Sequence, residues 1–189
     1  MRLLCRDPGR GEATRDELRR LSGNPRVECD VVDISDLSSV SAMVERQALA
    51  VVDVLVHNAG VLPATRELTR DGLERCFATH VVGPQRLTRL LEPALRASKD
   101  ARIVFVSSWA DTRSVELSLP RFHKLMRPLL RTPDQGADTI LWLAARNPPP
   151  PSGRLWFDRA AVSAHYLPWT REPATDRQRL WELVEQRSR

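Results

Sequence analysis

The feature that most restricts the fold of this chain is the alternation of short apolar runs with longer segments of helical periodicity. Residues 51–56 (VVDVLV) and 101–108 (ARIVFVSS) are nearly continuous apolar runs, and residues 27–34 (VECDVVDI) form a third run interleaved with acids. Continuous apolar runs are typical of parallel strands covered on both faces. The alternation therefore predicts an α/β fold, a parallel sheet with helices on both faces.

Segments with helical periodicity separate these runs. In chain order, the predicted helices are 11–21, 36–48, 69–98 with a break near Gly83-Pro84, 115–130 with a break at Pro120, 133–146 and 172–186. Further short strands are predicted at 2–5 and 153–158. Asp36 is placed to cap the second helix, and Pro8-Gly9-Arg10-Gly11 is typical of a turn before the first. In the last helix, Leu180, Trp181 and Val184 share one face, which we expect to point inward.

The length and composition fit one domain. The chain has 189 residues, of which 42% are apolar, and we predict a single domain over 1–189. No apolar run approaches the roughly 18 residues of a membrane span, and the start, MRLLCRDPGRGE, lacks the apolar segment of a signal peptide. The three cysteines are far apart and fit free thiols without metal-binding spacing. We therefore expect a cytoplasmic protein without a bound metal ion.

The basic character of the chain does not point to nucleic acid. The net charge is +5, but only Lys99 and Lys124 are lysines, and the arginines alternate with acids, as in residues 15–20 (RDELRR). A phosphate-binding face clusters its positive charge and usually includes lysines and aromatic residues. Mixed-sign helix faces are usually solvated surface. We therefore expect no nucleic-acid partner, whereas a homo-oligomer is compatible with the sequence.

A group of small residues follows the run at 51–56. Asn58-Ala59-Gly60 would let the backbone at the end of a strand lie close to a flat cofactor. An ordinary strand-to-helix turn has the same composition, so the motif by itself leaves both interpretations open. Its meaning depends on the segments around it.

Five segments in order resemble the short-chain dehydrogenase/reductase family. They are residues 56–60 (VHNAG), 77–83 (FATHVVG), 104–108 (VFVSS), 135–144 (QGADTILWLA) and 152–158 (SGRLWFD). The resemblance implies a Rossmann fold and hydride transfer between NAD(P)H and a carbonyl or alcohol. The positions that it assigns to the cofactor site are Arg6, Asp33, Asn58, Ala59, Gly60 and Thr112, and those that it assigns to catalysis are Ser108 and His80.

Three of these assignments have plain alternatives. By resemblance Asp33 lines the adenine pocket, but it could instead be a helix-capping acid that competes with Asp36. By resemblance Arg6 lies where a basic residue can pair with the 2′-phosphate of NADP, but a solvated arginine is the alternative. His80 takes the place of the family's asparagine, and it is either a substitute acid or base or a histidine that packs its helix.

Two parts of the family pattern have no counterpart in this sequence. The family's catalytic tyrosine is followed four residues later by a lysine, whereas the single tyrosine here, Tyr166, is followed at that spacing by Thr170. Residues 109–112 already resemble the segment after the family's sixth strand, so the catalytic helix and that strand are expected to be absent. The Gly9-x-Gly11 pair lacks a third glycine because position 14 is Thr14, and the family order would put the first strand and its glycine loop before Met1.

These losses predict an incomplete Rossmann-like sheet. The missing first strand is the central neighbour of strands 2–5 and 51–56, so the sheet either closes directly between them or splits there, with marginal stability. We interpret the chain as an NAD(P)-dependent oxidoreductase by family whose cofactor binding is impaired and which is inactive. The alternative is a non-catalytic, truncated module that binds or dimerises through the helix at 172–186.

Overall fold

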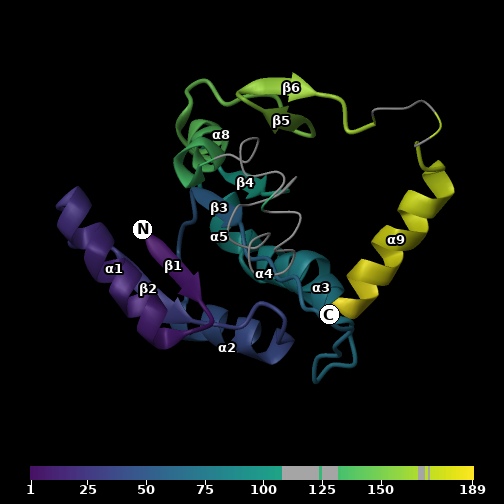
Figure 1. Ribbon diagram of the computed structural model, residues 1–189, viewed down its shortest axis with the longest axis horizontal. Helices are drawn as coiled ribbons and strands as arrows, with labels where there is room; N and C mark the ends of the chain where they lie inside the picture. Colours follow the sequence, from purple (N-terminus) through teal and green to yellow (C-terminus); the bar gives the residue numbers. More distant parts are fainter. Residues whose placement is uncertain (108–123, 125–131, 166–168, 170) are drawn as a thin grey trace.

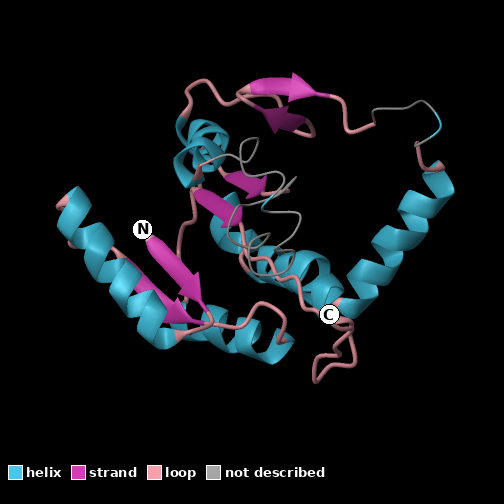
Figure 2. Cartoon of the chain, in the orientation of Figure 1, coloured by secondary structure: helices cyan, strands magenta, loops and turns pink. Residues whose placement is uncertain are grey.

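The computed structural model describes residues 1–107, 124, 132–165, 169 and 171–189. Helices and strands alternate through its first half (Figures 1 and 2). That half comprises β1 (Arg2–Cys5), α1 (Pro8–Ser22), β2 (Glu28–Val31), α2 (Leu37–Gln47), β3 (Val54–His57), α3 (Arg75–Phe77), the π-helical turn η1 (Ala78–Val82), α4 (Gly83–Leu90), α5 (Glu92–Arg96) and β4 (Arg102–Phe105). The second half comprises α8 (Pro133–Ala145), β5 (Leu155–Phe157), β6 (Ala160–Val162) and α9 (Ala174–Arg187).

The parallel strands form two separate pairs. β1 pairs with β2 and β3 pairs with β4, both in parallel, whereas β5 and β6 form an antiparallel hairpin. The registers place Leu3 opposite Cys29 and Leu55 opposite Ile103. The predicted parallel α/β fold is confirmed. Of the two predicted outcomes, direct closure or a split between β1 and β3, the described residues show the split.

Helices cover both faces of the first pair. On one face, α1 lies so close that a Cβ atom on Gly11 would come within 2.6 Å of the Cys29 sulfur. On the other face, the side-chain amide of Gln47 at the end of α2 donates to the Asp30 carboxylate over 2.6 Å. The doubly covered arrangement of a Rossmann-like fold is therefore present around β1 and β2.

The second pair is covered in the same way. The His57 ring at the end of β3 lies 2.8 Å from the Thr88 hydroxyl on α4. On the opposite face, the Arg102 guanidinium of β4 donates to the carbonyl of Leu143 on α8 over 3.1 Å. Helices therefore lie on both faces of both pairs, as the apolar runs predict.

One apolar core holds the two pairs together. Its buried residues come from the residue after β2, from β3, and from α2 and the segment of α4 and α5, and they are Val32, Val40, Met43, Leu55, Leu87, Leu91 and Leu95. Met43 of α2 and Leu87 of α4 are among the largest fully buried side chains. Since no hydrogen bonds join β1 to β3 among the described residues, the contact of α2 with α4 is the main link between the pairs.

The segment predicted as a turn at 8–11 is the first turn of α1. The Asp7 carboxylate accepts the Arg10 N–H over 2.9 Å, and Pro8 takes a first-turn position, where its fixed φ and its missing N–H cost nothing. The turn prediction was wrong because proline and glycine were taken as breakers, although Asp7 precedes them as a cap.

The predicted helix at 69–98 begins later and is interrupted. Leu68 and Glu74 form an isolated antiparallel bridge around Gly72, whose φ of 71° suits a glycine. The Glu74 carboxylate then caps α3 by accepting the N–H groups of Cys76 and Phe77. Apolar spacing alone did not reveal this loop, because Leu73 and Phe77 are four residues apart and fit a helical pattern that would begin before α3.

The C-terminal third departs from prediction in two places. The strand expected at 153–158 is present as β5, but it turns back into β6 through Asp158 and Arg159, which both have positive φ and lack the usual Asn-Gly signature. On α9, Val184 is buried as predicted, but Leu180 and Trp181 are 53% and 54% exposed, so the expectation that they point inward was wrong. The predicted helix at 115–130 lies almost wholly outside the described residues. In the part that is described, no helix is long and apolar enough to cross a membrane.

Candidate functional site

The site residues predicted from the sequence follow the carboxyl ends of the parallel strands. Arg6 comes directly after β1, Asp33 shortly after β2, and Asn58-Ala59-Gly60 directly after β3. Because β1–β2 and β3–β4 are separate pairs, Arg6 and Asp33 belong to one pair and Asn58-Ala59-Gly60 to the other. Ser108 and Thr112 lie outside the described residues.

Asp33 organises the turn between β2 and α2. Its carboxylate accepts both the backbone N–H and the hydroxyl of Ser35, over 2.9 Å and 2.7 Å, while its own N–H donates to the Ser39 hydroxyl over 3.1 Å. The cap of α2 is Asp36, whose carboxylate accepts the N–H groups of Ser38 and Ser39. The structure therefore decides against the capping alternative for Asp33 and leaves its carboxylate at the edge of a pocket.

Hydrogen bonding keeps the Asp36 carboxylate charged. The Ser38 hydroxyl donates to it over 2.6 Å, and this hydrogen bond, with those from the two backbone N–H groups, lowers the pKa of Asp36 below its ordinary value. Arg70, 3.8 Å away, adds a favourable charge. Asp36 therefore lines the pocket as a carboxylate that is already paired with Arg70.

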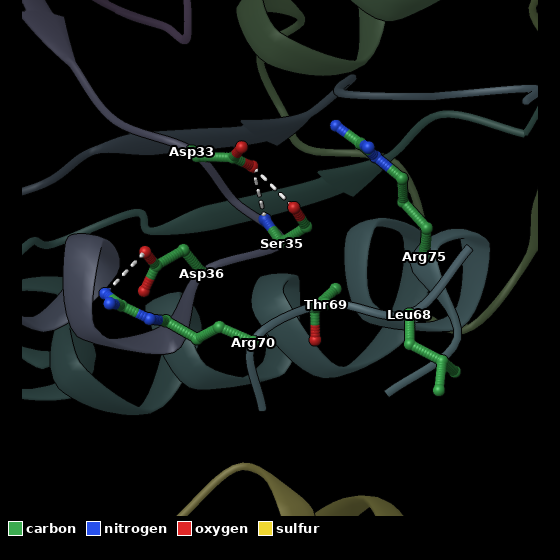
Figure 3. A pocket seen from close by; sticks show the side chains of 7 residues that line it. All are labelled: Asp33, Ser35, Asp36, Leu68, Thr69, Arg70 and Arg75. Carbon is green, nitrogen blue, oxygen red and sulfur yellow. Dashed lines mark hydrogen bonds and ion pairs between the residues drawn. The ribbon is translucent and has the colours of Figure 1, made fainter. Parts of the chain in front are cut away.

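The pocket has a volume of about 200 Å³ and a mixed-charge lining (Figure 3). It is lined by Asp33, Ser35, Asp36, Leu68, Thr69, Arg70 and Arg75. Sites that enclose a drug-sized ligand usually measure about 300–1,000 Å³, so this pocket has room for a fragment such as one base or ribose. Thr69, Arg70 and Arg75 were not predicted as site residues, because residues 69–74 lie in a loop where the sequence predicts a helix and Arg75 follows that loop.

The structure brings His80 to the Asn58-Ala59-Gly60 turn. His80 lies on the π-helical turn η1, and its Nε2 accepts the backbone N–H of Val61 over 2.9 Å. A Cβ atom on Gly60 would come within 3.6 Å of the same nitrogen. π-helical turns often occur at functional sites. Here the turn allows His80 to hold the segment after β3, a role that neither sequence-based interpretation included.

Replacing His80 by alanine should loosen this segment. The Val61 N–H would lose its acceptor, which costs about 1 kcal/mol of local stability. We expect amide hydrogen exchange at Val61 to become about fivefold faster, while exchange in α1 and α8 stays unchanged. His165→Ala, which removes a histidine from the C-terminal third, is the control. Equal exchange at Val61 in the wild type and His80→Ala would contradict this role.

The remaining predicted site residue, Arg6, is exposed and forms no ion pair with a described residue. This favours the solvated alternative for Arg6. Among the described residues, no group of three His, Cys, Asp or Glu side chains could hold a metal ion.

The family model and two similar relatives all match this chain to short chain dehydrogenases. The model of the family described as short chain dehydrogenase matches residues 1–118. Dehydrogenase/reductase SDR family member 12 of Bos taurus is 32% identical over 247 residues, covering 99% of this chain and 78% of the relative. The Homo sapiens protein of the same name is 31% identical and covers 97% and 77%. Since the bovine alignment is longer than this chain, it passes over segments of the relative that have no counterpart here.

Solved structures support the same fold. A metagenomic short-chain oxidoreductase in complex with NADP superimposes with a TM-score of 0.55 at 21% identity, covering 77% of this chain and 79% of that one. A short chain dehydrogenase from Mycobacterium smegmatis superimposes with a TM-score of 0.53 at 23% identity, covering 76% and 74%. At these identities the likeness concerns the fold.

Proposed function

This chain belongs to the short chain dehydrogenase family. We propose that it keeps the fold of this oxidoreductase family but does not itself carry out hydride transfer. The relationship supports a nicotinamide dinucleotide as the ancestral cofactor class. The sequence and the arrangement of the two strand pairs support loss of the reaction. The proposal rests on the proton-transfer residues.

The observation that carries the proposal is the absence of a tyrosine–lysine pair. Reduction of a carbonyl needs a proton donor at its oxygen, and a tyrosine with an ordinary pKa of about 10 needs a nearby cation to work near neutral pH. The only tyrosine is Tyr166, with Thr170 where the family has lysine. Neither Lys99 nor Lys124 has a tyrosine near it in sequence. The chain therefore lacks the family's means of moving the proton.

The cofactor side also supports the proposal. A dinucleotide must contact the edge after β2 and the edge after β3 together. Asp33 and Asn58-Ala59-Gly60 follow strands of two different pairs, and no strand hydrogen bonds join these pairs among the described residues. Gly11 is packed tightly against Cys29 and Cys5 in α1, so its lack of a side chain serves helix–strand packing. We expect NAD(P) binding to be weak, with any residual contact limited to one fragment in the Asp33 pocket.

The test is an assay for turnover. Purified chain is incubated with NADPH or NADH and a panel of aldehydes, ketones and quinones, and nucleotide oxidation is followed by absorbance. We expect no rate above that of a heat-denatured sample. A saturable rate that falls in the variants Asp33→Ala and His80→Ala would overturn the proposal, because these residues would then belong to a working site.

A second candidate function, self-association, is favoured by α9. The helix contacts the rest of the chain next to α3 and η1, at its C-terminal end (Figure 1). Its exposed apolar residues are Leu180, Trp181 and Leu183. Leu180 and Leu183 are three residues apart and share one face of α9, and a second copy of α9 packed on this face would cover both of them and Trp181.

Sedimentation measurements test this candidate directly. We expect a dimer for the wild type and a monomer for Trp181→Glu. The control is Leu141→Glu, which changes an equally exposed apolar residue on α8 and should remain a dimer. A wild type that stays monomeric at every concentration would exclude this function.

A further inference from the structure

Two cysteines on neighbouring strands meet under α1. Cys5 ends β1 and Cys29 lies in β2, and both side chains face α1. A Cβ atom on Gly11 would lie 2.6 Å from the Cys29 sulfur and 3.5 Å from the Cys5 sulfur. Both thiols therefore reach the same point beneath the helix, where the glycine leaves room for them.

The Cys29 thiol loses its proton less readily than an ordinary cysteine. Burial raises the pKa of Cys29 above its ordinary value, and the neighbouring Cys5 adds to the shift through its charge and a side-chain hydrogen bond. A thiol with a raised pKa is a poor nucleophile near neutral pH. Cys29 is therefore unsuited to act as a nucleophile, and we consider what the two cysteines could bind together.

The strand register disfavours a disulfide between them. Cys5 is opposite Val31 and Cys29 is opposite Leu3, so the two cysteines are offset by two residues along the ladder. With strands about 4.8 Å apart and a rise of about 3.3 Å per residue, their Cα atoms are separated by about 8 Å. A disulfide needs Cα atoms within about 7 Å, so oxidation to a disulfide would require the strands to shift.

We propose that Cys5 and Cys29 form a two-coordinate site for a soft monovalent metal ion, Cu(I) or Ag(I). Two collinear metal–sulfur bonds, each about as long as the 2.3 Å of a zinc–thiolate bond, place the sulfurs about 4.6 Å apart. Such a bridge spans the offset that a disulfide cannot. Thiolate ligands select soft ions of this kind.

The surroundings favour low coordination. Zinc in a structural site needs four ligands, but no third ligand group is present among the described residues. The two acids next to Cys29 in sequence, Glu28 and Asp30, point to the opposite face, where both carboxylates accept hydrogen bonds from Arg2. The two strands therefore supply two thiolate ligands, those of Cys5 and Cys29.

Charge is balanced during binding. Each thiol releases one proton as its sulfur bonds to the metal, so one monovalent ion displaces two protons and leaves a complex of net charge −1. Burial raises the pKa of Cys29, and the positive charge of Arg15 on α1 offsets a small part of that rise. The same charge would stabilise the anionic complex.

Cysteine alkylation in the wild-type chain tests the proposal without any variant. Protein is incubated with one equivalent of Cu(I) under nitrogen and treated with iodoacetamide, and each cysteine is quantified by peptide mass spectrometry. We expect Cys5 and Cys29 to be protected at least tenfold, while Cys76 reacts as in metal-free protein. Cys76 is a matched internal control, since it is also half-buried and burial also raises its pKa. Equal protection of all three, or of none, would overturn the site.

Serine variants give the stoichiometry. Competition with a chromophoric Cu(I) chelator should show one ion held per chain in the wild type and in Cys76→Ser. Cys5→Ser and Cys29→Ser should bind at least tenfold more weakly, with unchanged far-ultraviolet circular dichroism as evidence of folding. Wild-type affinity in either variant would contradict the proposal, because one thiolate would then suffice.

Discussion

Replacing Gly83 by alanine should destabilise the protein by about 3 kcal/mol or more, the upper range for overpacking. Gly83 is the first residue of α4, and a Cβ atom there would lie 1.9 Å from the Ile34 carbonyl oxygen and 2.8 Å from the Ile34 Cγ2 atom. The nearest of these atoms belongs to the backbone of Ile34, which cannot move aside as the end of a flexible side chain can. The variant must move α4 away from the turn between β2 and α2, which disturbs the contact that links the two strand pairs.

The matched control is Gly136→Ala. Gly136 is also helical, in α8, but a Cβ atom there would meet nothing within 4 Å. Alanine should stabilise this position by about 0.5–1 kcal/mol, because it lowers the entropy of the unfolded chain. Urea unfolding of both variants measures the contrast. Gly83→Ala with wild-type stability would show that α4 is not held against Ile34.

Lowering the pH from 7.5 to 5 should cost about 2 kcal/mol of stability through His57 alone. His57 ends β3 and is only 8% exposed; its ring stacks on Phe105 at 4.6 Å and its Nε2 lies 2.8 Å from the Thr88 hydroxyl. Burial lowers the pKa of His57 from 6.5 to about 4. Between pH 6.5 and about 4, His57 therefore stays neutral in the folded protein but is protonated in the unfolded chain.

The sign follows from these two values. Above pH 6.5 the histidine is neutral in both states, and its contribution to stability is fully present. As the pH falls from 6.5 towards 4, the unfolded state takes up a proton that the folded state excludes, so the free energy of unfolding decreases. Below about pH 4 both states are protonated and the loss from this residue levels off.

Comparison with His57→Gln isolates this effect, because the carboxylates titrate alike in both proteins. Urea unfolding at pH 7.5 and pH 5 should show a loss that is about 2 kcal/mol smaller in the variant than in the wild type. Equal losses would mean that His57 is protonated in the folded protein, in conflict with its burial.

The strands and most helices could be predicted because their signals are local. Apolar runs fixed β3 and β4, Asp36 marked the start of α2, and Pro133 marked the start of α8. Local signals did not reveal the turn between β5 and β6, where Asp158 and Arg159 have positive φ. Arg159 is held there by Thr139 and Asp138 of α8, which are distant in sequence. Which face of α9 is buried depends on the elements that it meets, so Trp181 could not be placed from its spacing.

The site was predictable in composition but not in arrangement. The Asn58-Ala59-Gly60 motif and Asp33 were found from the sequence and the family resemblance, and both follow strands as expected. The bond from Val61 to His80 could not be foreseen, because it depends on the π-helical turn. The pocket at Asp33 is also lined by Arg70 and Arg75. These two residues were not predicted, because the loop that contains Arg70 and precedes Arg75 was predicted to be helical.

The central claim is that this family member has lost its dinucleotide site, and titration with NADPH and NADH tests it most directly. Nucleotide fluorescence is followed while purified chain is added, after urea unfolding has shown a cooperative transition. The account predicts no saturable change with either nucleotide. Saturable, tight binding that is weakened by Asp33→Ala would contradict it, because the edges after β2 and β3 would then form one pocket despite the split sheet.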